Sequence, residues 1–292
     1  MTKCNVVEIV TPKKFVLNGL WFGSRRSKNG VIWVHGLGGS AFSKLKIAGL
    51  LADKNTAVIT FSNRGHDKVA SIVRDKGRKS ALGGAAHEVF TECVDDIQGA
   101  INFARKAGVK NVYIAGHSTG CQKSVFWASR KNGGKSVKGI ILLAPMSDYS
   151  AEVMLRGKRK IARATEVARA LLKRGKRHEL LPASAWHEPI DAQRFLSLLT
   201  GDSAEEIFTY SQPNKNPRIL KSVRVPLFVL LAGKDEYGDR SAKKISGWFE
   251  ENINARELDT RIIKKVLHSF FGAEKVVAIE IQKWIARNKR PL

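Results

Sequence analysis

The sequence has few cysteines, no long apolar run and a shortage of acidic residues. Its three cysteines, Cys4, Cys93 and Cys121, are too few and too scattered for a disulfide framework or a zinc site. No apolar segment approaches the ~20 residues that a membrane-spanning helix requires. The N-terminal residues lack the continuous apolar stretch of a secretory signal. These absences predict a cytoplasmic protein without a bound metal or other cofactor.

The shortage of acidic residues gives the chain a strong positive charge. There are 26 Asp and Glu against 51 Lys and Arg, so the formal net charge is +25 at pH 7. Such an excess is typical of proteins that bind nucleic acid, anionic membranes or acidic substrates, although it can also serve solubility alone. The hydrophobic fraction of 43% excludes a wholly disordered chain. The length of 292 residues suits one large α/β domain, with or without an insertion.

Short apolar segments recur along the chain. Five of them are almost wholly apolar: 31–35, 57–61, 112–116, 139–144 and 226–233. Strands of this kind belong to a sheet that is covered on both faces. Residues 6–10 and 15–22 are interpreted as opening strands that could form a hairpin, and 261–268 as a weaker final strand.

Segments with helical periodicity lie between these strands. Within 90–108, apolar residues recur at i, i+4, i+7 and i+11 from Phe90, and Gly108 is a plausible stop. Residues 276–288 close the chain in the same way. Strands that alternate with helices predict an α/β fold, with a mostly parallel sheet of about eight strands flanked by helices.

Residues 148–221 interrupt this alternation and contain no strand of the central type. We expect a helical insertion there, which leaves 1–147 and 222–292 as the core. The insertion contains one apolar stripe: Ile161, Ala164, Ala168, Leu171 and Leu172. A dense group of basic residues, spread over 156–177, surrounds that stripe.

The sharpest chemical signal is the segment Gly116-His117-Ser118-Thr119-Gly120, a G-x-S-x-G pattern between an apolar strand and a helix. A sharp strand-to-helix turn exposes the central serine and directs the helix N-terminus at a developing oxyanion. Flanking glycines avoid clashes across so tight a turn. A chance glycine-serine turn is the alternative, but the strand and helix context favours Ser118 as a nucleophile.

A second glycine turn, His35-Gly36-Leu37-Gly38-Gly39, directly follows another apolar strand. Tetrahedral intermediates need two backbone N–H donors where negative charge develops. We expect these donors to be Leu37 and Thr119. A phosphate-binding turn is the alternative, but G-x-G-x-x-G is not matched and no Walker lysine follows.

The acid and the base follow from chain order. In α/β folds that carry the serine on such a strand-to-helix turn, the order is Ser, then Asp or Glu, then His. Asp235 lies just past an apolar strand, and His268 is the one histidine that follows it. We therefore predict a Ser118–His268–Asp235 triad, in which His268 transfers the proton and Asp235 orients its ring. Asp239 and Asp148 remain alternatives for the acid.

The other histidines are interpreted more simply. His35 is expected to be a buried hydrogen-bonding residue, and His66 a support for its own loop. His117, at the variable position of the turn, could contact substrate. His178 and His187 lie in the insertion and are expected at the surface. No H-E-x-x-H motif or Cys/His cluster indicates a metal.

Taken in order, HGLGG, FSNRGHD, GHSTGCQ, LAGKDE and VLHSF resemble the α/β-hydrolase superfamily of serine hydrolases, which includes esterases and lipases. GHSTGCQ followed by LLAPMSDY is also similar to a subgroup of uncharacterised hydrolases related to fungal siderophore esterases. The HGLGG turn looks more like that of bacterial and archaeal esterases. The resemblance implies that 148–221 is a cap over the site.

Such a cap usually shapes the substrate pocket. The apolar candidates for its inner face are Trp186, Phe195, Leu196, Leu199 and Phe208. From these, Trp186 and Phe195 are predicted to contact substrate, as is His117. The alternative for each apolar residue is that it packs the cap onto the core.

The sequence thus predicts a hydrolase of small carboxylic esters that acts through an acyl-Ser118 intermediate. Thioesterases, amidases and peptidases use the same groups and stay open as alternatives. A basic binding protein on a hydrolase scaffold is a weaker alternative, because the positive charge is spread along the chain. Nucleic acid is therefore disfavoured as a partner. A patch at 156–177 could still steer anionic substrates or make transient contact with an acidic surface.

Overall fold

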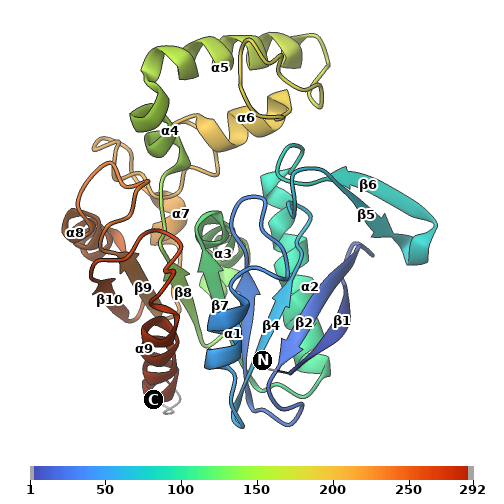
Figure 1. Cartoon of the computed structure of the whole chain (residues 1–292), viewed down its shortest axis with the longest axis vertical. Helices are drawn as coiled ribbons and strands as arrows, with labels where there is room; N and C mark the ends of the chain where they lie inside the picture. Colours follow the sequence, from blue (N-terminus) through green and yellow to red (C-terminus); the bar gives the residue numbers. More distant parts are fainter. Residues whose placement is uncertain (1–2, 289–292) are drawn as a thin grey trace.

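An eight-stranded sheet forms the centre of the protein, in a computed structural model that describes residues 3–288, the side chain of residue 76 excepted (Figure 1). The strand order is β1-β2-β4-β3-β7-β8-β9-β10. The bounds are β1 Cys4–Val10, β2 Val16–Phe22, β3 Asn29–Val34, β4 Thr56–Phe61, β7 Asn111–His117, β8 Gly139–Leu143, β9 Leu227–Ala232 and β10 Leu258–Ile263. β2 pairs antiparallel with β1 and β4, and every other pair is parallel. The predicted mostly parallel sheet and opening hairpin are confirmed.

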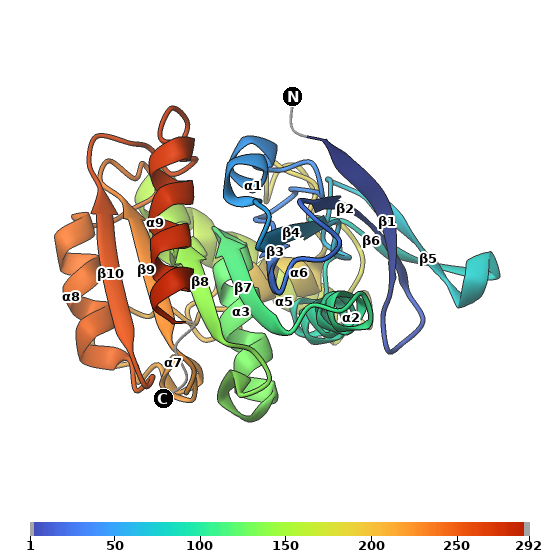
Figure 2. The ribbon, with the colours of Figure 1, turned by 90° about the horizontal axis from the view of Figure 1, so that it is seen from below.

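Helices cover both faces of this sheet, as the view from below shows (Figure 2). One face packs on α2, α3 and α8, and the other on α1 and α9. Their bounds are α1 Leu45–Leu51, α2 Cys93–Lys106, α3 Thr119–Arg130, α8 Ala242–Asn252 and α9 Glu274–Arg287. Every residue of β3, β4, β8 and β9 is buried, as is every residue of β7 after Asn111, which explains why these strands are almost wholly apolar. Within residues 3–288, no helix is long and apolar enough to cross a membrane.

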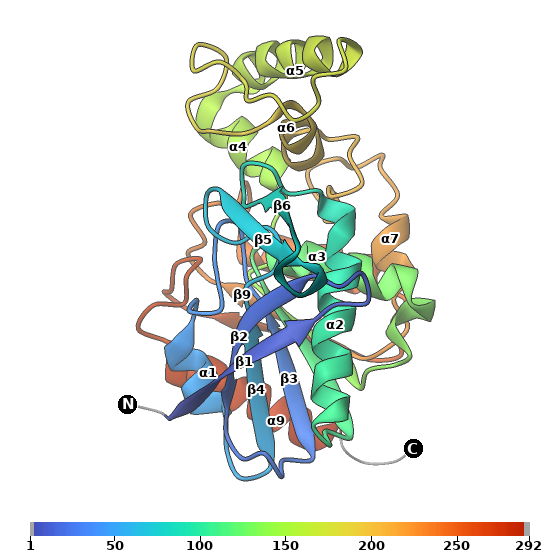
Figure 3. The same cartoon turned by 90° about the vertical axis from the view of Figure 1, so that its right-hand side faces the viewer.

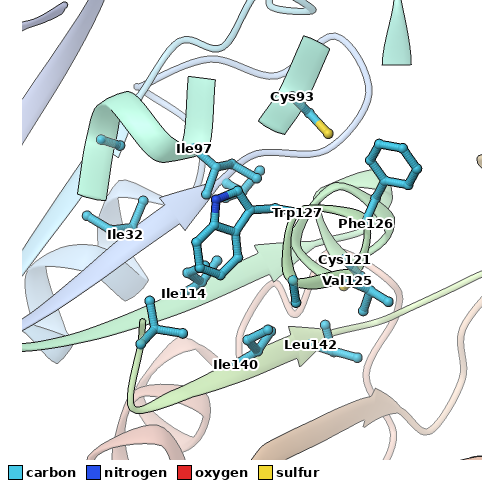
Figure 4. Packing of buried hydrophobic residues seen from close by; sticks show 14 of the residues in the cluster. Ile32, Cys93, Ile97, Ile114, Cys121, Val125, Phe126, Trp127, Ile140 and Leu142 are labelled. Atoms are coloured by element: carbon cyan, nitrogen blue, oxygen red, sulfur yellow. The ribbon is translucent and has the colours of Figure 1, made fainter. Parts of the chain in front are cut away.

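The packing around α3 fixes this helix on the sheet. Trp127 has no exposed surface and lies among Ile97, Ile114 and Ile140 in the cluster drawn in Figure 4. These neighbours come from α2, β7 and β8. Because α3 begins directly after Ser118, this packing also fixes the direction from which the helix N-terminus approaches that serine.

The structure differs from the predicted strands in two places. The final strand is β10, which ends at Ile263, so His268 lies in the following loop and not at a strand end. The chain leaves the strand through Lys265, whose φ of 59° is incompatible with extended backbone. A projecting two-stranded hairpin, β5 (Ala70–Arg74) and β6 (Lys79–Gly83), was not predicted, because most of its residues are exposed and carry no apolar pattern.

The segment between β8 and β9 carries four helices in the described structure. It contains α4 (Asp148–Arg156), α5 (Lys158–Lys173), α6 (Ala192–Leu199) and α7 (Arg218–Lys221). Helices α4 to α6 lie beyond the carboxyl ends of the strands (Figures 1 and 3).

The range 148–221 divides into two parts. Helices α4 to α6 share a hydrophobic cluster of their own, whereas Phe208, Tyr210 and Leu220 join the main cluster against the sheet. Only the first part therefore stands apart from the core. In α5 four residues of the predicted stripe are buried, but Leu172 is 39% exposed, because its position falls at the margin of the helix face.

A chain of buried charges joins the insertion to the core. Lys123 on α3 lies 2.6 Å from Glu88, which also lies 3.0 Å from Arg194 on α6. Arg194 in turn pairs with Glu205, and the side chains of both cations are 0% exposed. Burial opposes ionisation of Glu88, but Lys123 and Arg194 outweigh it and hold the Glu88 pKa below its ordinary value. Each of these four buried charges is therefore stabilised by the opposite charge beside it.

Replacing Arg194 with methionine tests this connection. Arg194→Met leaves Glu205 buried without its cation, and the free energy of unfolding should fall by about 3–5 kcal/mol. The matched control is Arg169→Met, because Arg169 makes a single exposed pair with Asp202 at 3.7 Å; its cost should stay below about 1 kcal/mol. Chemical denaturation measures both, and equal stabilities for the two variants would contradict the assignment.

Candidate active site

Ser118 occupies a strained turn between β7 and α3. Its φ of 56° and ψ of −128° lie outside the ordinary regions for a residue with a side chain. Two glycines make the turn possible. A Cβ on Gly116 would lie 2.3 Å from the Gly120 carbonyl oxygen, and a Cβ on Gly120 would lie 2.2 Å from the Val34 carbonyl oxygen. The backbones are thus too close for any other residue at either position.

The turn presents Ser118 to a cavity of about 430 Å³ at the carboxyl ends of the strands. The Ser118 hydroxyl lies 3.8 Å from the Met146 sulfur. The loop after β3, the loops after β8, β9 and β10, and the insertion all contribute to the wall. Its lining residues include Gly36, Leu37, Lys44, His117, Ala151, Glu152, Glu188, Leu198, Leu199, Tyr237 and His268.

Asp235 and His268 meet across two loops at this cavity. The Asp235 Oδ2 lies 2.9 Å from His268 Nδ1, and the His268 backbone N–H donates to Glu236 Oε2 at 2.8 Å. The Tyr237 ring packs edge-on against the imidazole, with centroids 5.0 Å apart. The ring of His268 is therefore held from its Nδ1 side, which leaves Nε2 for chemistry.

The two alternative acids are engaged elsewhere. Asp239 makes two contacts with the Arg240 guanidinium, at 2.9 and 3.0 Å. Asp148 accepts from the Gln122 amide at 2.7 Å, and burial raises its pKa well above the ordinary value. The carboxylate that contacts His268 is that of Asp235.

Ser118 and His268 border the same cavity. Across residues 3–288 no hydrogen bond joins Ser118 Oγ to His268 Nε2, and that nitrogen is buried without a partner. Catalytic hydrogen bonds are often long or misaligned before substrate binds. The Ser118 hydroxyl instead contacts the Met146 sulfur.

Two backbone N–H groups beside Ser118 are free to bind an anion. In the described part of the chain, neither the Leu37 nor the Thr119 N–H donates a hydrogen bond. The loop after β3 approaches Ser118 closely, because a Cβ on Gly36 would lie 2.9 Å from the Ser118 Cβ. Backbone N–H groups without a partner are the donors that an oxyanion hole would use.

His117 and His35 support the site as neutral rings. Burial lowers the pKa of each to about 3, so neither carries charge near pH 7. His117 borders the cavity, and its Nε2 lies 3.1 Å from the His268 carbonyl oxygen, to which it can donate. His35 Nε2 accepts the Asn63 N–H at 3.1 Å, which ties the glycine turn to the loop after β4.

Trp186 and Phe195 are not among the residues that line the cavity at Ser118. Phe195 has no exposed surface, and Trp186 packs edge-on against it with centroids 5.1 Å apart. Trp186 lines a smaller neighbouring cavity of about 70 Å³, which it shares with Leu37. Among the five apolar candidates of the insertion, Leu199 borders the cavity at Ser118, together with Leu198.

Lys44, Met146 and Tyr237 also line the cavity at Ser118, but the sequence did not identify them as site residues. Met146 and Tyr237 follow β8 and β9 closely, so the rule that strand ends carry function could have found them. No sequence signal singles out Lys44, which has a φ of 59° and donates to the Ser269 carbonyl oxygen at 2.7 Å. Burial lowers the Lys44 pKa.

The sheet order and the serine turn define an α/β-hydrolase fold. The chain belongs to the family described as protein of unknown function (DUF1749), whose family model matches residues 69–285. A search of curated protein sequences finds no match.

Several solved structures share the fold. The siderophore hydrolase EstB from Aspergillus fumigatus is 19% identical, with a TM-score of 0.69 over 98% of this chain and 99% of that one. DcsB in complex with its substrate analogue is 14% identical, with a TM-score of 0.67 and the same coverage. Est1E from Butyrivibrio proteoclasticus with bound ferulic acid is 15% identical, with a TM-score of 0.62 over 97% and 98%. The resemblance to α/β-hydrolases is confirmed.

Two glycine-to-alanine changes test the serine turn. Gly120→Ala places a methyl group against backbone, and should lower the free energy of unfolding by about 1–3 kcal/mol. The matched control is Gly247→Ala in α8, where an added Cβ meets nothing within 4 Å. It should stabilise the protein by about 0.5–1 kcal/mol, because alanine favours a helix over glycine. Thermal or chemical unfolding distinguishes the two, and a harmless Gly120→Ala would refute the close approach.

Proposed function

We propose that this protein is a serine hydrolase of carboxylic esters that acts through an acyl-Ser118 intermediate. The observation that carries the proposal is one cavity bordered by a serine on a strained turn and by a histidine paired with a carboxylate, Asp235, at 2.9 Å. The similarity in fold to esterases supports the same chemistry.

In the acylation step, His268 Nε2 accepts the proton of the Ser118 hydroxyl while Oγ bonds to the ester carbonyl carbon. The N–H groups of Leu37 and Thr119 bind the resulting oxyanion. When the tetrahedral intermediate collapses, its carbon–oxygen bond to the alcohol breaks, and His268 protonates the departing alkoxide.

Deacylation repeats these transfers with water. His268 takes a proton from a water molecule, whose oxygen bonds to the acyl carbon. When this second tetrahedral intermediate collapses, the bond between the acyl carbon and Ser118 Oγ breaks, the carboxylic acid leaves, and His268 returns the proton to Oγ. Asp235 keeps the Nδ1 proton in place and stabilises the imidazolium that forms in both steps. His117 acts as a positioning residue, since it holds the backbone carbonyl of His268.

The insertion serves as a cap that completes the acyl pocket. Ala151, Leu198 and Leu199 supply apolar wall, and a cavity of about 430 Å³ suits a small-molecule ester. Thioesters and amides are alternative substrates, because the same groups would cleave them. The three thiols are free, which suits a reducing cytoplasm.

A fluorophosphonate probe tests the nucleophile, because it phosphonylates serines that a neighbouring base activates. The probe should label the wild-type protein and should not label Ser118→Ala. Ser43→Ala is the matched control, since Ser43 borders the same cavity; it should label as the wild type does. Mass spectrometry of the intact protein measures the adduct, and a wild type that stays unlabelled at neutral pH would refute the proposal.

The acid is tested by two asparagine substitutions four residues apart. Asp235→Asn should reduce kcat for p-nitrophenyl butyrate on the order of 10³- to 10⁴-fold, because the imidazole loses its orienting carboxylate. Asp239→Asn should keep kcat within about threefold of the wild type, since Asp239 contacts Arg240 and not His268. Similar losses in both variants would show that Asp235 has been misassigned.

A further inference from the structure

A second cavity lies at the opposite end of the sheet from Ser118. It has a volume of about 710 Å³ and is formed where β7, β8, β9 and β10 begin, between the last residues of α2 and α9. Figure 2 views the molecule from this end. We refer to it as the amino-end cavity.

Positive charge is concentrated in the amino-end cavity. Half of its fourteen lining residues are Lys or Arg: Arg105, Lys110, Lys135, Lys138, Arg224, Arg256 and Arg287. In the whole chain these residue types are 51 of 292, about one in six. The one acidic lining residue is Glu257. The share of Lys and Arg among the lining residues is therefore about three times that of the whole chain.

Most of these cations have no carboxylate partner. Arg287 pairs with Asp259 at 3.1 Å, but for the other six no carboxylate oxygen of residues 3–288 lies within 4.0 Å. Arg105 and Arg224 donate to the carbonyl oxygens of Ser136 and Asn254, which do not neutralise them. Mutual repulsion among such charges is relieved when a polyanion binds between them.

The shape of the cavity distinguishes it from the basic helix α5. Its floor is made of Val112, Val137 and Val225, which are buried, while the cations rise around it from separate segments of the chain. Cations from several segments around one hollow can contact several oxygens of one small ligand at once. On α5, by contrast, Lys158 and Arg159 are exposed along a single helix.

The lining also indicates which anion fits. None of the fourteen lining residues is aromatic, so the cavity offers no ring on which a nucleic-acid base could stack. Arginine forks bind phosphate oxygens through paired hydrogen bonds. We propose that the amino-end cavity binds a small ligand with several adjacent phosphates, such as inorganic triphosphate or the triphosphate of a nucleotide.

Isothermal titration calorimetry in 150 mM KCl tests this proposal with the full-length protein. The ligands are inorganic triphosphate, ATP and AMP. We expect one site for triphosphate and for ATP, and much weaker binding of AMP, which has a single phosphate. Equal affinities for triphosphate and ATP would identify the phosphate chain as the ligand, and tighter ATP binding would identify a nucleotide; both support the proposal.

A triple variant locates the site. Lys138→Gln, Arg224→Gln and Arg256→Gln together remove three exposed cations of the cavity, and should weaken triphosphate binding about 100-fold. The matched control removes the same charge from α5 through Lys158→Gln, Arg159→Gln and Arg163→Gln, and should keep the wild-type affinity. Circular dichroism checks that both variants are folded. Ester hydrolysis should be unchanged in both, so a failure here is distinguishable from a failure of the proposed esterase.

Three outcomes would overturn the proposal. The first is no triphosphate binding by the wild type, or AMP binding as tight as that of ATP. The second is an equal loss of affinity in the α5 control, which would indicate attraction by net charge alone. The third is a single-stranded RNA or a phosphatidylglycerol vesicle that binds tightly at the cavity and displaces triphosphate, because the occupant would then be a polymer or a membrane.

Discussion

The close approach of three backbone segments around Ser118 governs the rest of the site. The turn after β7 packs on the end of β3 at distances that only glycine tolerates at positions 116 and 120. A serine held at positive φ costs on the order of 1–3 kcal/mol, and it persists because the packing of α3 on the sheet determines it. The same packing places the Gly36 backbone against the Ser118 side chain. The strained serine and the nearby glycine turn thus share one cause.

The parallel sheet also places two chemically different cavities at its opposite ends. Loops that leave the strands carry Ser118, Asp235 and His268, and loops that enter them carry the unpaired cations of the amino-end cavity. The net charge of +25 is therefore unevenly arranged. The cavity at Ser118 contains carboxylates as well as Lys44, whereas the opposite end is dominated by lysine and arginine.

Much of the fold could be predicted from the sequence, because buried parallel strands are apolar throughout and leave an unmistakable pattern. The edge strand β10 is half exposed, so its limits were misplaced. Chain order singled out His268, and its contact with Asp235 required coordinates to distinguish that acid from Asp239. Trp186 and Phe195 carried only their apolar character, which cannot distinguish a pocket wall from the interior of the insertion. The contacts of Lys44 and the ion pairs of Arg194 could not be predicted from the sequence. Their partners include Ser269 and Glu88, which lie far away along the chain.

The chain of charges from Lys123 through Glu88 to Arg194 and Glu205 limits how this protein could be rearranged by recombination. Here an exchange of 148–199 would remove Arg194 and leave Glu205, in the chain that returns to the core, without its cation. A viable chimaera would have to transfer Glu205 together with the foreign segment, or supply a basic residue at the same depth. The segment that must be exchanged as one unit therefore extends beyond helices α4 to α6 and includes Glu205.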